Sequence, residues 1–145
     1  MQGAQAEETA TFRLDARLAA DCVVLGDLAL CRVLLFRDQR FPWLILVPRR
    51  TPAVEIIDLD PADQSRLWSE VAAASVVLKS MTGCHKLNVA ALGNMVPQLH
   101  VHIVARFRSD AAWPQPVWGQ GRAEPYAREV ELALIDRLKA GFGLP

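Results

Sequence analysis

Residues 98–104 of the chain read QLHVHIV, and this stretch carries the clearest structural and chemical pattern in the sequence. Apolar residues stand at positions 99, 101 and 103 and polar residues at 98, 100 and 102, which is the two-residue period of a β-strand with one face on the core. Gln98, His100 and His102 are therefore predicted to share the opposite face, about 6.6 Å apart in succession along the strand. Arg106 falls on the same side.

Two imidazoles on one strand face can both contact a small anionic group such as a phosphate. Because the unperturbed pKa of imidazole is about 6.5, one ring can be an unprotonated nucleophile while its neighbour donates a proton or a hydrogen bond. Two other interpretations remain open from the spacing: His100 and His102 titrate in solvent on a half-exposed face, or they are ligands in a small metal-binding domain. A metal site needs more ligands, and the nearby sequence offers only His85 and Asp110.

The rest of the chain predicts a sheet around this strand. Apolar and β-branched segments, separated by short polar breaks, predict five strands, and the first three form an antiparallel meander. Their ranges are 21–28, 31–37, 43–47, 86–92 and 99–107, with residues 93–97 connecting the last two. We expect a five-stranded, mostly antiparallel sheet.

Two helices complete an α+β fold. Asp60 can cap a helix that begins at Pro61, Asp63 lies favourably near its positive end, and apolar residues then repeat at helical spacing as far as Thr82, before Gly83. This main helix is expected to pack on the sheet. A C-terminal helix is predicted from about residue 125 to 140, after an irregular segment.

Length and composition limit the class of protein. With 145 residues, 52% of them hydrophobic and 22% charged, the chain fits a single globular domain covering 1–145. Within it, residues 1–11 are predicted to be a loose N-terminal arm and residues 110–145 to form the irregular segment and the C-terminal helix. The 16 basic and 16 acidic residues are interspersed, which argues against a nucleic-acid partner.

The cellular compartment is also an expectation from the sequence. Three cysteines, far apart and without a C-x-x-C pair, favour a reducing cytoplasm over a disulfide framework. The polar, acidic N-terminus does not resemble a signal peptide, and no apolar run approaches the roughly 20 residues that span a bilayer. We therefore expect a cytoplasmic protein without a membrane partner.

Residues 93–106, GNMVPQLHVHIVAR, resemble the signature of the histidine triad (HIT) superfamily. That signature is His-φ-His-φ-His-φ-φ, where φ is apolar, preceded by a glycine, an amide residue and a short turn. The resemblance extends from about residue 21 to 106. It implies an α+β fold, a small-molecule nucleotide substrate, nucleotide hydrolase or transferase activity, as in dinucleoside polyphosphate hydrolases, and a homodimer.

The resemblance also implies roles for individual residues. His100 would attack the α-phosphate of a nucleoside conjugate and form a nucleotidyl-histidine that water releases. His102 would contact the phosphate oxygens and assist the leaving group. Asn94 would hydrogen-bond a non-bridging oxygen, although Asn also suits a turn, and Asn88 would lie near the same phosphate. Asp38 is a candidate for a ribose contact, with a solvated loop carboxylate as the alternative.

The sequence departs from the family pattern at several positions, and two of them concern the expected histidines. Gln98 stands at the first triad position, where an amide can hold hydrogen bonds but cannot shuttle protons. Trp43 follows Pro42 where many members have an additional histidine. The implied mechanism requires no metal, although Mg²⁺ could accompany a polyphosphate substrate. Two alternatives remain: a nucleotide-binding relative with little or no turnover, and a small metal-binding domain that uses His100 and His102.

Overall fold

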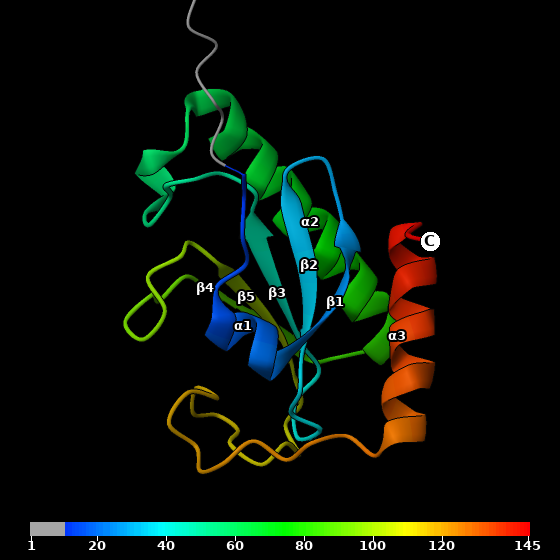
Figure 1. Cartoon of the computed structure of the whole chain (residues 1–145). Coiled ribbons are helices and arrows are strands. Elements are labelled where there is room, and N and C mark those ends of the chain that lie inside the picture. The colour runs from blue at the N-terminus through cyan, green and yellow to red at the C-terminus, as the bar shows by residue number, and fades with distance from the viewer. Residues whose placement is uncertain (1–10) are drawn as a thin grey trace, which may run out of the picture.

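The computed structural model describes residues 11–145, so the predicted loose arm lies outside the described residues except for its last residue. The described residues form an α+β fold around a five-stranded antiparallel sheet, in the order β1-β2-β3-β5-β4 (Figure 1). The strands are β1 (Cys22–Asp27), β2 (Cys31–Phe36), β3 (Trp43–Pro48), β4 (Lys86–Ala90) and β5 (Val101–Arg106). The predicted fold class is confirmed.

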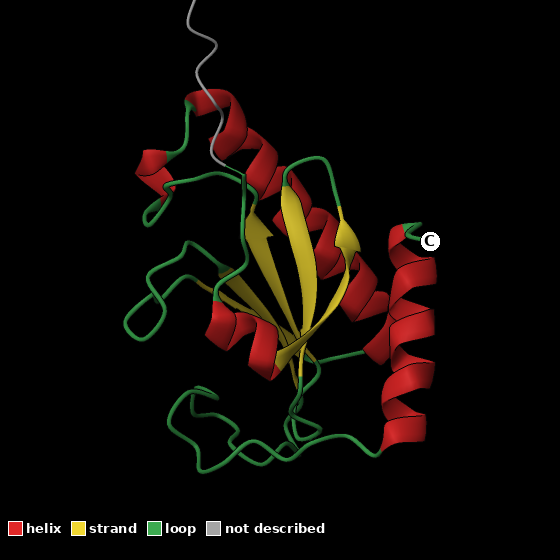
Figure 2. Cartoon of the chain, viewed as in Figure 1, coloured by secondary structure: helices red, strands yellow, loops and turns green. Residues whose placement is uncertain are grey.

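The helices lie close to the predicted positions, with two additions (Figure 2). The main helix α2 (Pro61–Thr82) begins where Asp60 accepts a hydrogen bond from the Asp63 amide and ends at Gly83, whose φ of 63° is left-handed. The C-terminal helix α3 (Arg128–Phe142) starts and ends slightly later than predicted. Within residues 11–145, no helix is long and apolar enough to cross a membrane.

The two unpredicted elements are short. They are α1 (Ala16–Asp21) and a 3₁₀ helix, η1 (Ile56–Asp58). Six residues give less than two turns, which is too little for a helical period to show in the sequence. The start of α1 is nevertheless capped, because the Asp15 side chain accepts from the Arg17 amide.

Both faces of the sheet are covered. Residues at odd positions of β5 pack with α2 in one apolar core, and Val104 packs in a second core on the opposite face, with Leu18 of α1 and Val117 of the irregular segment. The histidine-bearing face is therefore not the half-exposed surface that one of the sequence interpretations required. Figure 1 shows α1 and the loop that precedes α3 on the side of the sheet away from α2.

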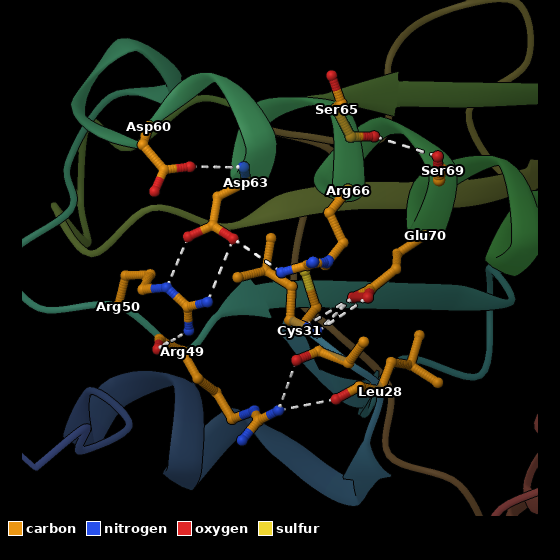
Figure 3. A network of polar contacts seen from close by, with 12 residues as sticks. Leu28, Cys31, Arg49, Arg50, Asp60, Asp63, Ser65, Arg66, Ser69 and Glu70 are labelled. Carbon is orange, nitrogen blue, oxygen red and sulfur yellow. Dashed lines mark hydrogen bonds and ion pairs between the residues drawn. The ribbon is translucent and has the colours of Figure 1, made fainter.

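Two buried carboxylates attach α2 to the ends of the strands (Figure 3). Glu70 accepts hydrogen bonds from the amides of Leu30 and Cys31, at 2.9 and 2.7 Å, at the start of β2. Asp63 pairs with Arg50, which follows β3, at 2.6 Å. Since a buried carboxylate requires such partners, these contacts set how α2 lies along the sheet.

The strand of residues 98–104 begins later than predicted. His102 is opposite Ile45 in the ladder between β3 and β5, whereas Leu99 donates its amide to the carbonyl of Ala53 in a loop. His100 therefore lies immediately before β5 rather than within it. Its main chain is not paired with β3 or β4, and it is the last residue of the segment that connects β4 to β5.

Candidate active site

The structure brings His100 and His102 together in a buried position. Their ring centroids are 4.8 Å apart, with the planes inclined at 69°. Only 6% of His100 and 8% of His102 is exposed. This burial contradicts the interpretation that the two rings lie in solvent on a half-exposed face.

Trp43 determines the tautomer of His102. The Trp43 indole donates its Nε1–H to Nδ1 of His102 at 3.0 Å. Because an indole N–H can only donate, Nδ1 carries the lone pair and the proton of the neutral ring is on Nε2. Burial, together with the neighbouring His100, lowers the pKa of His102 to about 3. His102 is thus a neutral ring that can donate one hydrogen bond from Nε2.

His100 has the complementary tautomer. Its Nδ1 lies 2.6 Å from the main-chain oxygen of Gln98. A carbonyl oxygen can only accept, so Nδ1 carries the proton and Nε2 of the neutral ring keeps its lone pair. The same hydrogen bond orients the ring. The pair therefore combines an unprotonated nitrogen with an N–H donor, which is what an attack on a phosphate requires.

An aromatic cleft of about 490 Å³ opens over the two histidines. Trp43, Trp118 and Phe36 supply its aromatic surface, and the Trp118 ring meets the His102 ring edge-on at 5.3 Å. Seven further apolar or glycine residues and four polar ones complete the lining: Leu18, Ile45, Leu92, Gly93, Met95, Val96 and Gly119, with Asp21, Asn94, His100 and His102. A flat aromatic base would find stacking partners in this aromatic cleft.

A second cavity of about 360 Å³ also borders His100. It is lined by residues 54–57 around η1, by residues 91–93 after β4, and by Leu99 and His100. Leu92, Gly93 and His100 line both cavities. A phosphate at His100 would therefore border both the aromatic cleft and this η1 cavity.

Of the predicted site residues, Asn94 accompanies the two histidines, because it lines the aromatic cleft. The side chain of Gln98 does not enter the histidine pair. Its Oε1 accepts from the Asp15 amide at 2.8 Å and its Nε2 donates to the Arg13 carbonyl at 2.9 Å, so both ends of the amide hold the segment before α1. Only the main-chain oxygen of Gln98 contacts His100.

Asp38 and Asn88 are not brought to the cleft. The Asp38 carboxylate is buried, pairs with Arg40 at 2.9 Å and accepts from the Glu124 amide, so it is neither solvated nor available to a ribose. Asn88 lies on β4, opposite Val104, and its Oδ1 accepts from the buried Arg106 at 2.8 Å. Both side chains are used by structural arginines, because a buried guanidinium needs several acceptors.

Sequence reasoning missed Trp43 and Trp118 as site residues. Trp43 belongs to β3, all six residues of which are buried, so its apolar surface alone is typical of core packing. The indole N–H of Trp43 could have indicated a role in the site, since a buried indole N–H usually requires an acceptor. Trp118 lies in the irregular segment, and no sequence pattern indicates that this segment returns to β5.

The described residues offer little support for the metal-binding alternative. Across residues 11–145, no three His, Cys, Asp or Glu side chains gather in a way that could hold a metal ion. Nδ1 of each site histidine is also engaged, by Trp43 and by the Gln98 carbonyl. Only the two Nε2 atoms could reach a ligand.

The chain is thus an α+β protein in which a buried histidine pair lies at the start of an inner strand of an antiparallel sheet, beside an aromatic cleft. The family model of the HIT domain matches residues 17–109. The chain belongs to the HIT domain family, whose members generally bind or hydrolyse nucleotides.

Solved structures agree with this assignment. Histidine triad proteins from Bradyrhizobium japonicum, Sinorhizobium meliloti 1021 and Marinobacter aquaeolei VT8 are 49%, 45% and 45% identical to the chain. Their TM-scores are 0.88, 0.88 and 0.89, and the alignments cover 90%, 92% and 92% of this chain and 98%, 98% and 97% of theirs. No curated protein matches the chain.

Proposed function

We propose that the chain is a nucleotide hydrolase or nucleotidyltransferase that cleaves a nucleoside conjugate at its α-phosphate through a nucleotidyl-His100 intermediate. The single observation that carries this proposal is the tautomer of His100. Its Nδ1 is held by the Gln98 carbonyl at 2.6 Å, which leaves the lone pair on Nε2 beside the aromatic cleft.

The reaction has two displacements. In the first, Nε2 of His100 bonds to the α-phosphorus, and the leaving group departs with the electron pair of its bond. In the second, water attacks phosphorus, the P–N bond returns its pair to Nε2, and a proton is lost to solvent. Splitting one difficult displacement into two easier ones is the advantage of a covalent intermediate.

The neighbouring side chains support both displacements. His102 donates its Nε2–H to a phosphate oxygen as negative charge builds, and Asn94 offers a further amide donor. The base of the nucleoside occupies the aromatic cleft beside Trp118. No metal is needed for these steps, although Mg²⁺ could accompany a polyphosphate substrate.

The test is release of AMP from diadenosine tetraphosphate and from an adenosine phosphoramidate, with mass spectrometry for an adenylyl group on His100. We expect release by the native protein and a loss of at least about 10³-fold in His100→Ala. His85→Ala is the matched control, because His85 is exposed and contacts Arg108 and Trp113 rather than the cleft.

Other outcomes separate the alternatives. Nucleotides that raise the melting temperature without product release would indicate a binding protein with little turnover. A stoichiometric metal found by elemental analysis, and lost in His100→Ala, would favour the metal-binding domain. The proposed homodimer is tested by light scattering, where a monomer at micromolar concentration contradicts it.

A further inference from the structure

A third cavity, of about 150 Å³, lies between the helices α2 and α3 and the strands β2 and β3. Figure 1 shows α3 beside the C-terminal end of α2, where this cavity is enclosed. We call it the helix cavity. Six apolar side chains from all four elements form most of its wall: Leu35, Leu44, Leu78, Met81, Leu134 and Leu138.

The helix cavity is separate from the histidine site. Leu35 and Leu44 belong to the core that packs against α2, whereas Ile45, which lines the aromatic cleft, belongs to the core on the opposite face of the sheet. Among residues 11–145, Trp43 alone lines both spaces. The sheet therefore divides the helix cavity from the aromatic cleft, and a molecule in one leaves the other free.

The wall of the helix cavity favours an apolar occupant. Four of its leucines are at most 2% exposed, so the cavity reaches into the core: Leu35, Leu44, Leu78 and Leu138. Water is poorly held in such a place, because an ordered water needs two to four polar partners. Apolar cavities of about this volume in proteins take up molecules of the size of benzene.

Two of the polar side chains in the lining already have partners. The Thr82 hydroxyl donates to the Leu78 carbonyl within α2 at 2.8 Å, and the Gln39 amide donates to the Glu124 carboxylate at 3.4 Å. The polar groups that remain for an occupant are the hydroxyl of Tyr126 and the guanidinium of Arg137.

Tyr126 lies just before α3 and is half-buried. Burial, together with the carboxylates of Asp38 and Glu131, raises the pKa of Tyr126 to about 12, so its hydroxyl keeps its proton and can donate at neutral pH. Asp38 pairs with Arg40 at 2.9 Å and Glu131 with Arg37 at 3.2 Å. The two carboxylates near Tyr126 are thus compensated and oppose an anion in the cavity only weakly.

Arg137 is the charged residue of the lining. None of the ion pairs within residues 11–145 involves Arg137. No acid stands at the helix positions that would face it, three and four residues away, which hold Ala133, Leu134, Ala140 and Gly141. An exposed guanidinium at an apolar cavity suits a carboxylate, which it can bind through two parallel hydrogen bonds.

We propose that the helix cavity is a binding site for a small apolar monocarboxylate, of about the size of benzoate. The apolar body lies among the leucines between α2, α3 and the sheet, and the carboxylate pairs with Arg137. The Tyr126 hydroxyl is the second donor at the same cavity. This site takes no part in the chemistry of His100 and does not depend on the proposed function.

The experiment titrates the ¹⁵N-labelled protein with benzoate and, separately, with benzamide, the neutral molecule of the same shape. Ligands of this size bind in the millimolar range or tighter. We expect saturable shifts of amides in α2 and α3 around the cavity, and an affinity for benzoate at least about fivefold above that for benzamide, because hydrogen bonds to a charged acceptor are stronger. Equal affinities, no saturable shift, or shifts confined to the surroundings of His100 overturn the inference.

Variants locate the ligand within the cavity. Arg137→Gln removes the charge at an exposed position and should lower the affinity for benzoate to that for benzamide. Arg128→Gln is the matched control, because Arg128 is exposed on the same helix but does not line the cavity, so benzoate should bind this variant as it binds the native protein. Native affinity in Arg137→Gln, or an equal loss in both variants, overturns the role of Arg137.

Leu134→Trp fills the cavity with a larger side chain and should abolish the binding of both ligands. His100→Ala should bind benzoate with native affinity, because the sheet separates His100 from the helix cavity. Loss of benzoate binding in His100→Ala, or native binding in Leu134→Trp, contradicts the proposed position.

Discussion

The hydrogen bond from Trp43 to His102 is the contact that sets the chemistry of this site at the scale of single residues. Ile45 is the direct ladder partner of His102, and Trp43 stands two positions along β3 on the same face. Diagonal neighbours on adjacent strands are close enough for long side chains to touch. The Trp43 indole therefore donates to Nδ1 of His102 and disfavours the imidazolium, in which Nδ1 would carry a proton.

Replacing Trp43 by Phe should release this constraint. We expect ¹⁵N NMR to show His102 as a mixture of tautomers and kcat/KM to fall by about tenfold, the equivalent of one lost hydrogen bond. Trp118→Phe is the control, since Trp118 also lines the cleft but its Nε1 has no partner among the described residues. An unchanged His102 spectrum in Trp43→Phe would show that burial alone selects the tautomer.

At the scale of elements, the aromatic cleft is assembled from pieces that arrive from opposite ends of the chain. Residues before α1 are held by the Gln98 amide, and α1 then places Leu18 and Asp21 in the lining. The segment after β5 returns Trp118 to the same cleft. Neither piece has a strong helical or strand period, so tertiary contacts must hold each of them.

Gln98→His restores the first triad histidine in sequence but should not restore a triad in structure. We expect no gain in kcat, a loss of about 1–2 kcal/mol in the free energy of unfolding, and faster hydrogen exchange at the Asp15 amide. Gln98→Glu is the comparison, because it keeps the acceptor for Asp15 and removes the donor to Arg13. A clear rise in kcat for Gln98→His would show that position 98 serves the histidines directly.

The segment after β5 depends on the ion pair of Asp110 with Arg106, which is 1% exposed. Asp110 also accepts from the amides of Phe107, Ala112 and Trp113. Asp110→Asn leaves the guanidinium buried and uncompensated, so we expect a loss of about 3–5 kcal/mol in urea unfolding. Asp27→Asn, in the partly exposed pair with Arg32, should cost no more than about 1 kcal/mol. Similar losses in the two variants would contradict this role.

For the molecule as a whole, the buried His102 makes folding depend on pH. In the folded state the pKa of His102 is lowered to about 3, first by burial and then by His100. In the unfolded chain it is about 6.5. Between these values the unfolded state binds the extra proton, so stability decreases as pH falls below about 6.5.

The pH dependence can be measured by urea unfolding at pH 7, 6 and 5. His102 should contribute a slope of at most about 1.4 kcal/mol per pH unit in this range. His102→Gln should remove that contribution and serves as the control. Asp110 affects stability in a lower pH range. Burial raises the pKa of its carboxyl, but the ion pair with Arg106 and the hydrogen bonds from three amides outweigh burial and lower the pKa to about 2. The stabilisation that Asp110 provides is therefore lost as the pH falls below about 4. Equal slopes for native protein and His102→Gln between pH 7 and 5 would contradict the assignment.

Local sequence patterns are sufficient to predict the helices and strands whose hydrophobic periods extend over enough residues. The main helix could be predicted from Asp60, Pro61 and Gly83, because capping and backbone preferences are local. The five strands and the alternation around His100 and His102 followed in the same way, as did the resemblance to the HIT superfamily. These features depend on residues that are close together in the chain.

Tertiary structure decided everything that depends on which groups meet across the chain. It placed Trp43 against His102, engaged the Gln98 side chain with residues 13 and 15, and used Asp38 and Asn88 as acceptors for structural arginines. The chemistry of a side chain determines which kinds of group it can bond to, but packing determines which of those groups it meets. The sequence therefore indicated His100 as the candidate nucleophile, whereas the tautomers of the two histidines and the cavities beside them emerged only from the fold.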